Sequence, residues 1–78
     1  MASERLDALA DYIQERVKLR KFCLVSENDL DRIWPRESLS PEERKKGILV
    51  FAKANNWEAT FHDYDRGILV RFISLRSD

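Results

Sequence analysis

The residues with the most chemical potential in this chain are His62, Asp63 and Asp65, which lie together in the stretch HDYD. An imidazole beside carboxylates could ligate a metal ion or take part in acid–base catalysis. All three residues fall within four consecutive positions, however, and the chain has no second histidine. Aspartate is typical of turns without any metal, and zinc sites use several well-separated nitrogen and sulfur ligands. We therefore expect no metal site.

Covalent catalysis has equally little support in the sequence. Cys23 is the only cysteine, which excludes an internal disulfide and any multi-cysteine metal site. Its apolar neighbours, Phe22 and Leu24, are typical of a small core residue. No spacing of serine, cysteine and histidine indicates a nucleophile with its base, and no glycine-rich phosphate loop is present. We expect no catalytic residues, no cofactor and no enzyme activity.

The charges of the chain are balanced, with 14 basic and 14 acidic residues and a formal net charge of 0. A neutral chain has no overall field to draw it to nucleic acid, so such binding would depend on local patches. The densest basic cluster, residues 16–21, could hold phosphates or could complement the dipole at the end of a helix. No apolar run approaches the ~20 residues of a membrane span or forms a signal peptide, so we expect a cytoplasmic protein without membrane contact.

A chain of 78 residues is long enough for one domain, so we expect a single domain over residues 1–78. An apolar stripe at helical spacing predicts a first helix over 4–20, with Ser3 as its N-cap. A short apolar run predicts a strand over 22–25. A second helix is predicted over 27–34, and Pro35 ends it, because the residue before a proline disfavours helical backbone.

The tetrapeptide Gly-Ile-Leu-Val occurs twice, and its surroundings predict a different structure for each copy. The first copy follows the helix-start signal SPEE and therefore lies in a third helix, from Pro41 to about Asn55. The second copy lies among β-branched and aromatic residues. These residues predict a hairpin with strands over 57–62 and 68–74, joined by the five-residue loop DYDRG.

The expected fold is α+β, with three helices, a short strand and a C-terminal hairpin in the order α-β-α-α-β-β. This order resembles a winged helix-turn-helix domain, with LVSENDLDRIW as the short strand and second helix and SPEERKKGILVFAKANNW as the third helix and strand entry. The resemblance covers Ser3 to about Ser74. It implies that the short strand pairs with the hairpin, that the third helix enters the DNA major groove and that the hairpin loop forms the wing.

The resemblance implies a non-catalytic DNA-binding domain, such as a small transcriptional regulator. A regulator that reads a palindromic site would be a homodimer. The third helix would supply cations to the groove and to phosphates, and the wing would supply an aromatic ring and a further cation. The nucleic-acid-binding residues implied are Arg44, Lys45, Lys46, Lys53, Tyr64 and Arg66.

The third helix also has a feature that does not suit base reading. Leu49 and Val50 lie away from its apolar stripe, where base reading favours arginine, lysine, asparagine and glutamine. The alternative is a protein–protein interaction module on the same fold, which would use Leu49, Val50 and the indole of Trp34. Packing of the third helix on two sides would also explain why Leu49 and Val50 are apolar. RNA binding by the hairpin and the basic helix is a third functional hypothesis.

Overall fold

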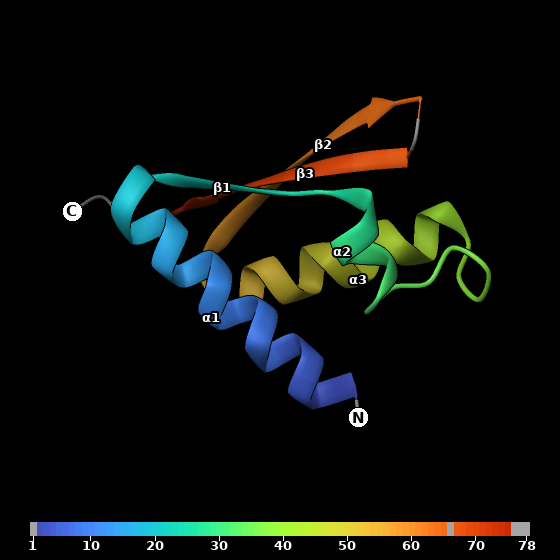
Figure 1. The fold of residues 1–78 in the computed structure, drawn as a ribbon, viewed down its shortest axis with the longest axis horizontal. Helices are drawn as coiled ribbons and strands as arrows, with labels where there is room; N and C mark the ends of the chain where they lie inside the picture. The colour runs from blue at the N-terminus through green and yellow to red at the C-terminus, as the bar shows by residue number, and fades with distance from the viewer. Residues whose placement is uncertain (1, 66, 76–78) are drawn as a thin grey trace.

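The computed structural model describes residues 2–65 and 67–75, and the side chains from residue 5 onward within these ranges. The order of elements is the predicted one, and the α+β fold with a C-terminal hairpin is confirmed (Figure 1). The elements are α1 (Ala2–Arg20), β1 (Phe22–Val25), α2 (Glu27–Asp31), α3 (Pro41–Ala54), β2 (Trp57–Tyr64) and β3 (Gly67–Ser74).

The three strands form one antiparallel sheet in the order β1-β3-β2. The short strand therefore pairs with the hairpin through β3, where Phe72 lies between Cys23 and Ala59. The helices lie on one side of this sheet (Figure 1). Side chains alternate between the two faces, so Cys23 and Phe72 are buried under the helices while Leu24 and Arg71 are exposed on the open face.

The core lies between the sheet and the helices. Its largest fully buried side chains are Phe72, Ile13, Leu30, Ile48, Val25 and Val70. Four aromatic rings also pack edge to face: Phe51 contacts Trp34, Trp57 and Phe72, with centroid distances of 5.6, 5.8 and 6.1 Å. Because α3 contributes Phe51 and the sheet contributes Trp57 and Phe72, these rings fix the position of α3 against the sheet.

Helix α1 buries Leu9, Ile13 and Val17, which are four residues apart and therefore share one face. The helix begins at Ala2, so Ser3 lies inside it and the predicted N-cap is wrong. The helix ends before Lys21, whose φ of 74° turns the chain toward β1.

The other element ends differ from prediction in two places. Helix α2 ends at Asp31, although the amide of Trp34 still donates to the carbonyl of Leu30 at 2.7 Å. The hairpin loop is much shorter than predicted, because β2 continues to Tyr64, which pairs with Gly67. Two-residue loops follow the twist of antiparallel strands well, and the extended pairing places Tyr64 in a strand rather than in a loop.

Candidate functional site

The outward surface of α3 carries an apolar centre between two lysines. Helix α3 buries Ile48 and Ala52 against the core, and the side chains on its opposite side are exposed. Leu49 is 47% exposed and Val50 is 62% exposed, so neither packs between two layers. The α3 outer row consists of Lys46, Leu49, Val50 and Lys53.

The spacing of the α3 outer row places a cation one turn to each side of its apolar pair. Lys46 precedes Leu49 by three residues and Lys53 follows Val50 by three, and residues at this spacing are neighbours on a helix surface. Such a row offers apolar contact at its centre and ammonium groups at its ends. Such a row suits a ligand that has apolar groups at its centre and negative charges on either side of them.

Arg44 does not lie on this surface, which corrects the prediction that it contacts phosphates. Its side chain is buried, and its guanidinium forms a bidentate ion pair with Glu27, with Nη2–Oε2 at 2.7 Å and Nη1–Oε1 at 3.2 Å. Its Nε also donates to the backbone carbonyl of Trp34 at 2.7 Å. These contacts hold the guanidinium of Arg44 between α2 and the chain beyond it.

Glu27 joins α2 to α3 and to β3. Besides Arg44, its carboxylate accepts a hydrogen bond from the amide of Ile68 at 3.1 Å and lies 3.6 Å from Nε of the exposed Arg36. No pattern in the sequence predicted this Glu27–Arg44 pair. A signal for Arg44 existed, since it lies one helical turn before the buried Ile48, whereas the charge pattern around Glu27 resembles an ordinary first turn.

Both glycines of the repeated tetrapeptide make room for residues near α2. A Cβ on Gly47 would lie 2.6 Å from Nε1 of Trp34, and a Cβ on Gly67 would collide with the Glu27 side chain. Gly67 also has a φ of 142°, a conformation that favours glycine. Trp34 itself is 8% exposed, so its indole is part of the core and does not serve as the exposed anchor that the protein-interaction alternative assumed.

The remaining predicted residues are scattered. Lys45 is half-buried, with its Nζ 5.7 Å from the ring centroid of Phe61. Tyr64 is exposed at the end of β2, and Arg66 lies outside the described residues. The structure therefore brings Lys46, Lys53, Leu49 and Val50 into one row and leaves Tyr64 on a different element.

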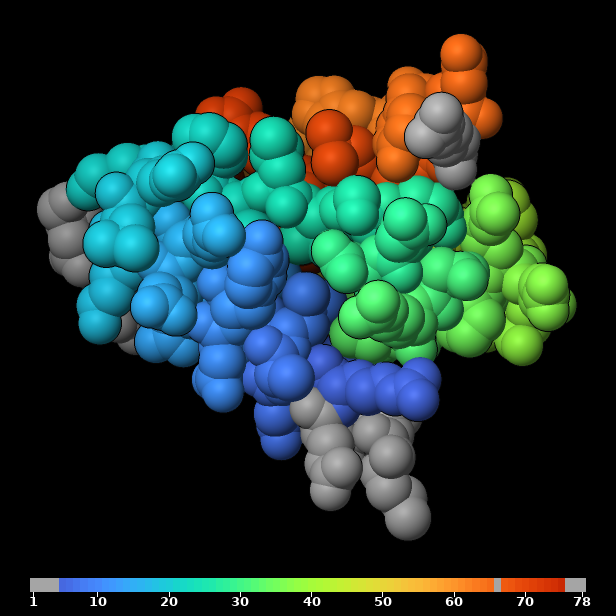
Figure 2. Space-filling model, in the orientation of Figure 1, coloured from blue at the N-terminus to red at the C-terminus, as the bar shows by residue number. Residues whose placement is uncertain are grey.

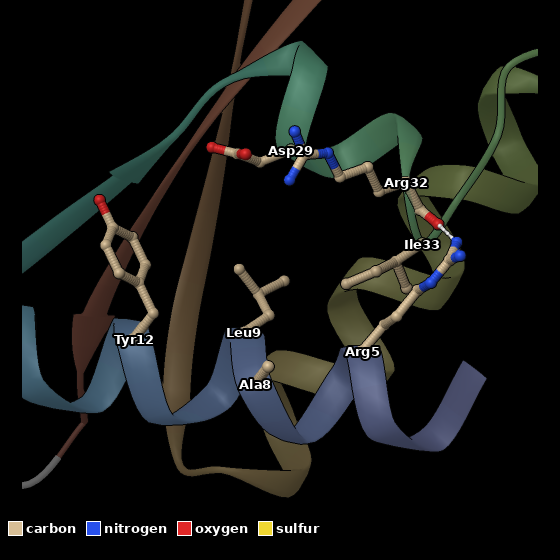
Figure 3. A pocket seen from close by; sticks show the side chains of 7 residues that line it. All are labelled: Arg5, Ala8, Leu9, Tyr12, Asp29, Arg32 and Ile33. Carbon is tan, nitrogen blue, oxygen red and sulfur yellow. Dashed lines mark hydrogen bonds between the residues drawn. The ribbon is translucent and has the colours of Figure 1, made fainter. Parts of the chain in front are cut away.

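A groove of about 680 Å³ lies between α1 and α2, and no residue pattern predicted it. It is lined by Arg5, Ala8, Leu9, Tyr12, Asp29, Arg32 and Ile33 (Figure 3). Figure 2 shows the face of the molecule on which α1 and α2 lie side by side. The groove is lined by two basic side chains, Arg5 and Arg32, and one acidic side chain, Asp29. Arg5 donates a hydrogen bond to the backbone carbonyl of Arg32 at 3.0 Å. That hydrogen bond ties α1 to the chain beyond α2 at one end of the groove.

Among the described residues, two titratable groups have shifted pKa values, and local structure explains both. Burial raises the pKa of the Cys23 thiol; the charge of Arg16 opposes this effect and that of Asp29 adds to it. At the start of α3, the Glu43 carboxylate accepts from the backbone amide of Ser40 at 2.9 Å, and hydrogen bonding from the Ser40 backbone and then from its side chain lowers the pKa of Glu43. The amide of Glu43 donates in turn to the Ser40 hydroxyl, which completes the capping box. Neither group lies in the α3 outer row.

Two searches of the described residues found nothing. No group of three or more His, Cys, Asp or Glu side chains in residues 5–65 and 67–75 could hold a metal ion. No helix in the part of the chain that the structure describes is long and apolar enough to cross a membrane. Comparison of the chain with protein-family models, curated proteins and solved structures finds no match.

Proposed function

We propose that this chain is a non-catalytic protein-binding domain whose α3 outer row docks a partner segment with apolar side chains flanked by carboxylates. The observation that carries the proposal is the exposure of Leu49 and Val50, at 47% and 62%, between two exposed lysines. The two ammonium groups favour a partner with negative charge on both sides of its apolar residues.

The apolar contact of this row contributes part of a binding free energy. Full burial of a leucine or valine side chain contributes roughly 1.5–3 kcal/mol, and about half of each side chain here is still exposed. Two such residues therefore offer about 2 kcal/mol in total from apolar contact. The lysines add attraction for an acidic partner, which raises its rate of association more than its final affinity.

DNA binding, which the winged-helix resemblance implies, has weaker support. The first turn of α3 exposes Glu42 and Glu43, at the end of a recognition helix that normally contacts base edges. Carboxylates at that position repel phosphates, and Arg44 is committed to Glu27. Lys46 and Lys53 remain as exposed cations on α3 for such a role.

The proposal is tested by selecting binders from a displayed peptide library with the wild-type protein. We expect selected peptides to be enriched in apolar residues next to aspartate or glutamate. A Leu49→Ser/Val50→Ser variant should lose these peptides, because both side chains are exposed and their loss removes the apolar contact without unfolding the domain. Leu19→Ser is the matched control, since Leu19 is 75% exposed on α1 and lies away from the row.

A second titration addresses DNA directly. Fluorescence anisotropy of a labelled random-sequence duplex should show no binding at tens of micromolar protein and low salt. Binding that weakens as salt rises and disappears in Lys46→Glu/Lys53→Glu would overturn the protein-docking proposal in favour of DNA. Peptide selection that is unchanged by Leu49→Ser/Val50→Ser would also overturn it.

A further inference from the structure

In the part of the chain that the structure describes, no segment pairs with the outer edge of strand β2. It is an outer strand of the sheet and pairs with β3 over eight residues. Natural monomers protect such edges with lysine, proline, bulges or short strands. Strand β2, with the sequence WEATFHDY, contains no lysine, arginine, proline or glycine, whereas β1 at the opposite edge has four residues.

The direction of the backbone groups along this edge follows from one hydrogen bond. The amide of Leu75 donates to the carbonyl of Asn56 at 2.9 Å, one position beyond the pair of Trp57 and Ser74. Asn56 and Leu75 are therefore a hydrogen-bonded pair. Hydrogen-bonded and non-bonded pairs alternate along an antiparallel ladder, so residues 58, 60 and 62 also direct their amides and carbonyls toward β3. Ala59 and Phe61 therefore direct theirs toward the free edge.

The side chains beside this edge on the open face form a row of complementary chemistry. Glu58, Thr60 and His62 are all exposed. Directly opposite Glu58 and His62 on β3 lie Ile73 and Leu69, which are apolar. The acid and the imidazole are four residues apart on one extended strand, about 13 Å at ~3.3 Å per residue, so they do not reach each other within one chain.

We propose that β2 binds β2 of a second copy of this chain, antiparallel, with the two-fold axis at Thr60. In this register Glu58 lies opposite His62 of the second copy, and His62 lies opposite the second copy's Glu58. Thr60 lies opposite its own equivalent. The backbone groups of Ala59 and Phe61 form the new hydrogen bonds, and the two three-stranded sheets become one continuous sheet.

Other registers satisfy fewer groups. A shift by one residue would place the outward backbone groups of one strand against the inward groups of the other, and no ladder would form. A shift by two residues keeps the ladder but places Glu58 opposite Thr60 or Tyr64. A carboxylate that faces an imidazole can accept a hydrogen bond from its N–H, and such cross-strand polar pairs stabilise strand pairing, which selects the pairing centred at Thr60.

Disulfide formation tests both the dimer and its register. Facing residues of a non-bonded pair have Cα atoms about 4.5 Å apart, within the range for a disulfide. Thr60→Cys should therefore give a covalent dimer quickly in a glutathione redox buffer. Glu58→Cys, which faces His62 rather than itself, is the matched control, and the buried Cys23 should give little background in the wild type.

Sedimentation equilibrium of charge-swapped variants provides the second arm. Glu58→Lys should weaken the dimer roughly two- to thirtyfold, because two attractive pairs are lost at once. Glu58→Lys/His62→Glu should restore it, since each lysine again faces a carboxylate. A wild-type protein that stays monomeric at several hundred micromolar would overturn the proposal. So would equal cross-linking of Thr60→Cys and Glu58→Cys, or a double variant no tighter than Glu58→Lys.

Discussion

Replacement of Arg44 by methionine should strongly destabilise the fold. Methionine is close to arginine's aliphatic stem in size, so the change keeps the apolar packing of that stem and removes the buried guanidinium. Glu27 then keeps a buried carboxylate with the Ile68 amide and the more distant Arg36 as its remaining contacts. The Trp34 carbonyl also loses its hydrogen bond from Arg44.

The expected size of this effect follows from the burial of both partners. Breaking a buried ion pair by removal of one partner costs about 3–5 kcal/mol. Arg36 lies 3.6 Å from the carboxylate but is 60% exposed, so its compensation is small and we expect about 3 kcal/mol. A domain of this length has a free energy of unfolding of about 4–12 kcal/mol, so the variant loses a large share of it.

Urea denaturation measures this loss through the fluorescence of Trp34 and Trp57, which are both buried. The midpoint of Arg44→Met should fall sharply, with a decrease of about 12–24 °C in melting temperature. Arg36→Met is the control, because an exposed ion pair contributes at most about 1 kcal/mol. Glu27→Gln/Arg44→Met should recover much of the stability, since glutamine keeps an acceptor for the Ile68 amide and no buried charge is left unpaired.

Equal stability of Arg44→Met and Arg36→Met, within about 0.5 kcal/mol, would contradict a stabilising role for the buried ion pair. That result would mean that the guanidinium is as well solvated as a surface group. A double variant less stable than Arg44→Met would refute the claim that the unpaired carboxylate is the source of the cost.

Three further predictions concern other parts of the structure. Gly47→Ala should lower the free energy of unfolding by about 1–3 kcal/mol in urea denaturation, because its Cβ would meet the Trp34 indole, although alanine normally stabilises a helix. The thiol of Cys23 should react with a disulfide reagent far more slowly in native protein at pH 8 than in concentrated urea, because burial shields it and raises its pKa. The lowered pKa of Glu43 means that its capping contribution is present at neutral pH and lost as the pH falls below the usual carboxyl range, about 4. The urea midpoint of the wild type should therefore decrease between about pH 7 and pH 3 by more than the midpoint of Glu43→Gln does. Glutamine keeps the hydrogen bonds of the cap and does not titrate. Equal decreases in the two proteins would contradict a capping contribution from the Glu43 carboxylate.

Local signals in the sequence predicted most of the elements. Ser40 and Pro41 mark the start of α3 with a capping box that the structure confirms. The two copies of Gly-Ile-Leu-Val form helix and strand as predicted, because their flanking residues differ. Boundaries that depend on pairing were less accurate. Tyr64 joins β2 only because β3 offers it a partner across the hairpin, and no local signal encodes that.

The Glu27–Arg44 pair could not be predicted from either residue alone. The two residues are 17 positions apart, and each has a plausible solvated role in its own helix. Only tertiary packing decides that both are buried. The same limit applies to the surface of α3: helical periodicity separated Leu49 and Val50 from the buried stripe, but their exposure depended on what packs against the helix.

The close approach of Glu27 and Trp34 to the two tetrapeptide copies gives this fold a signature for recognising distant relatives. Glu27, Trp34, Arg44, Gly47 and Gly67 depend on one another through contacts and steric limits, with spacings of 6, 9, 2 and 19 intervening residues. A homologue that loses the tryptophan frees its α3 glycine to become alanine, and one that loses the acid removes the clash behind its hairpin glycine. In an alignment these positions should vary in pairs while the intervening surface diverges, so a search weighted on the five will reach further than overall identity.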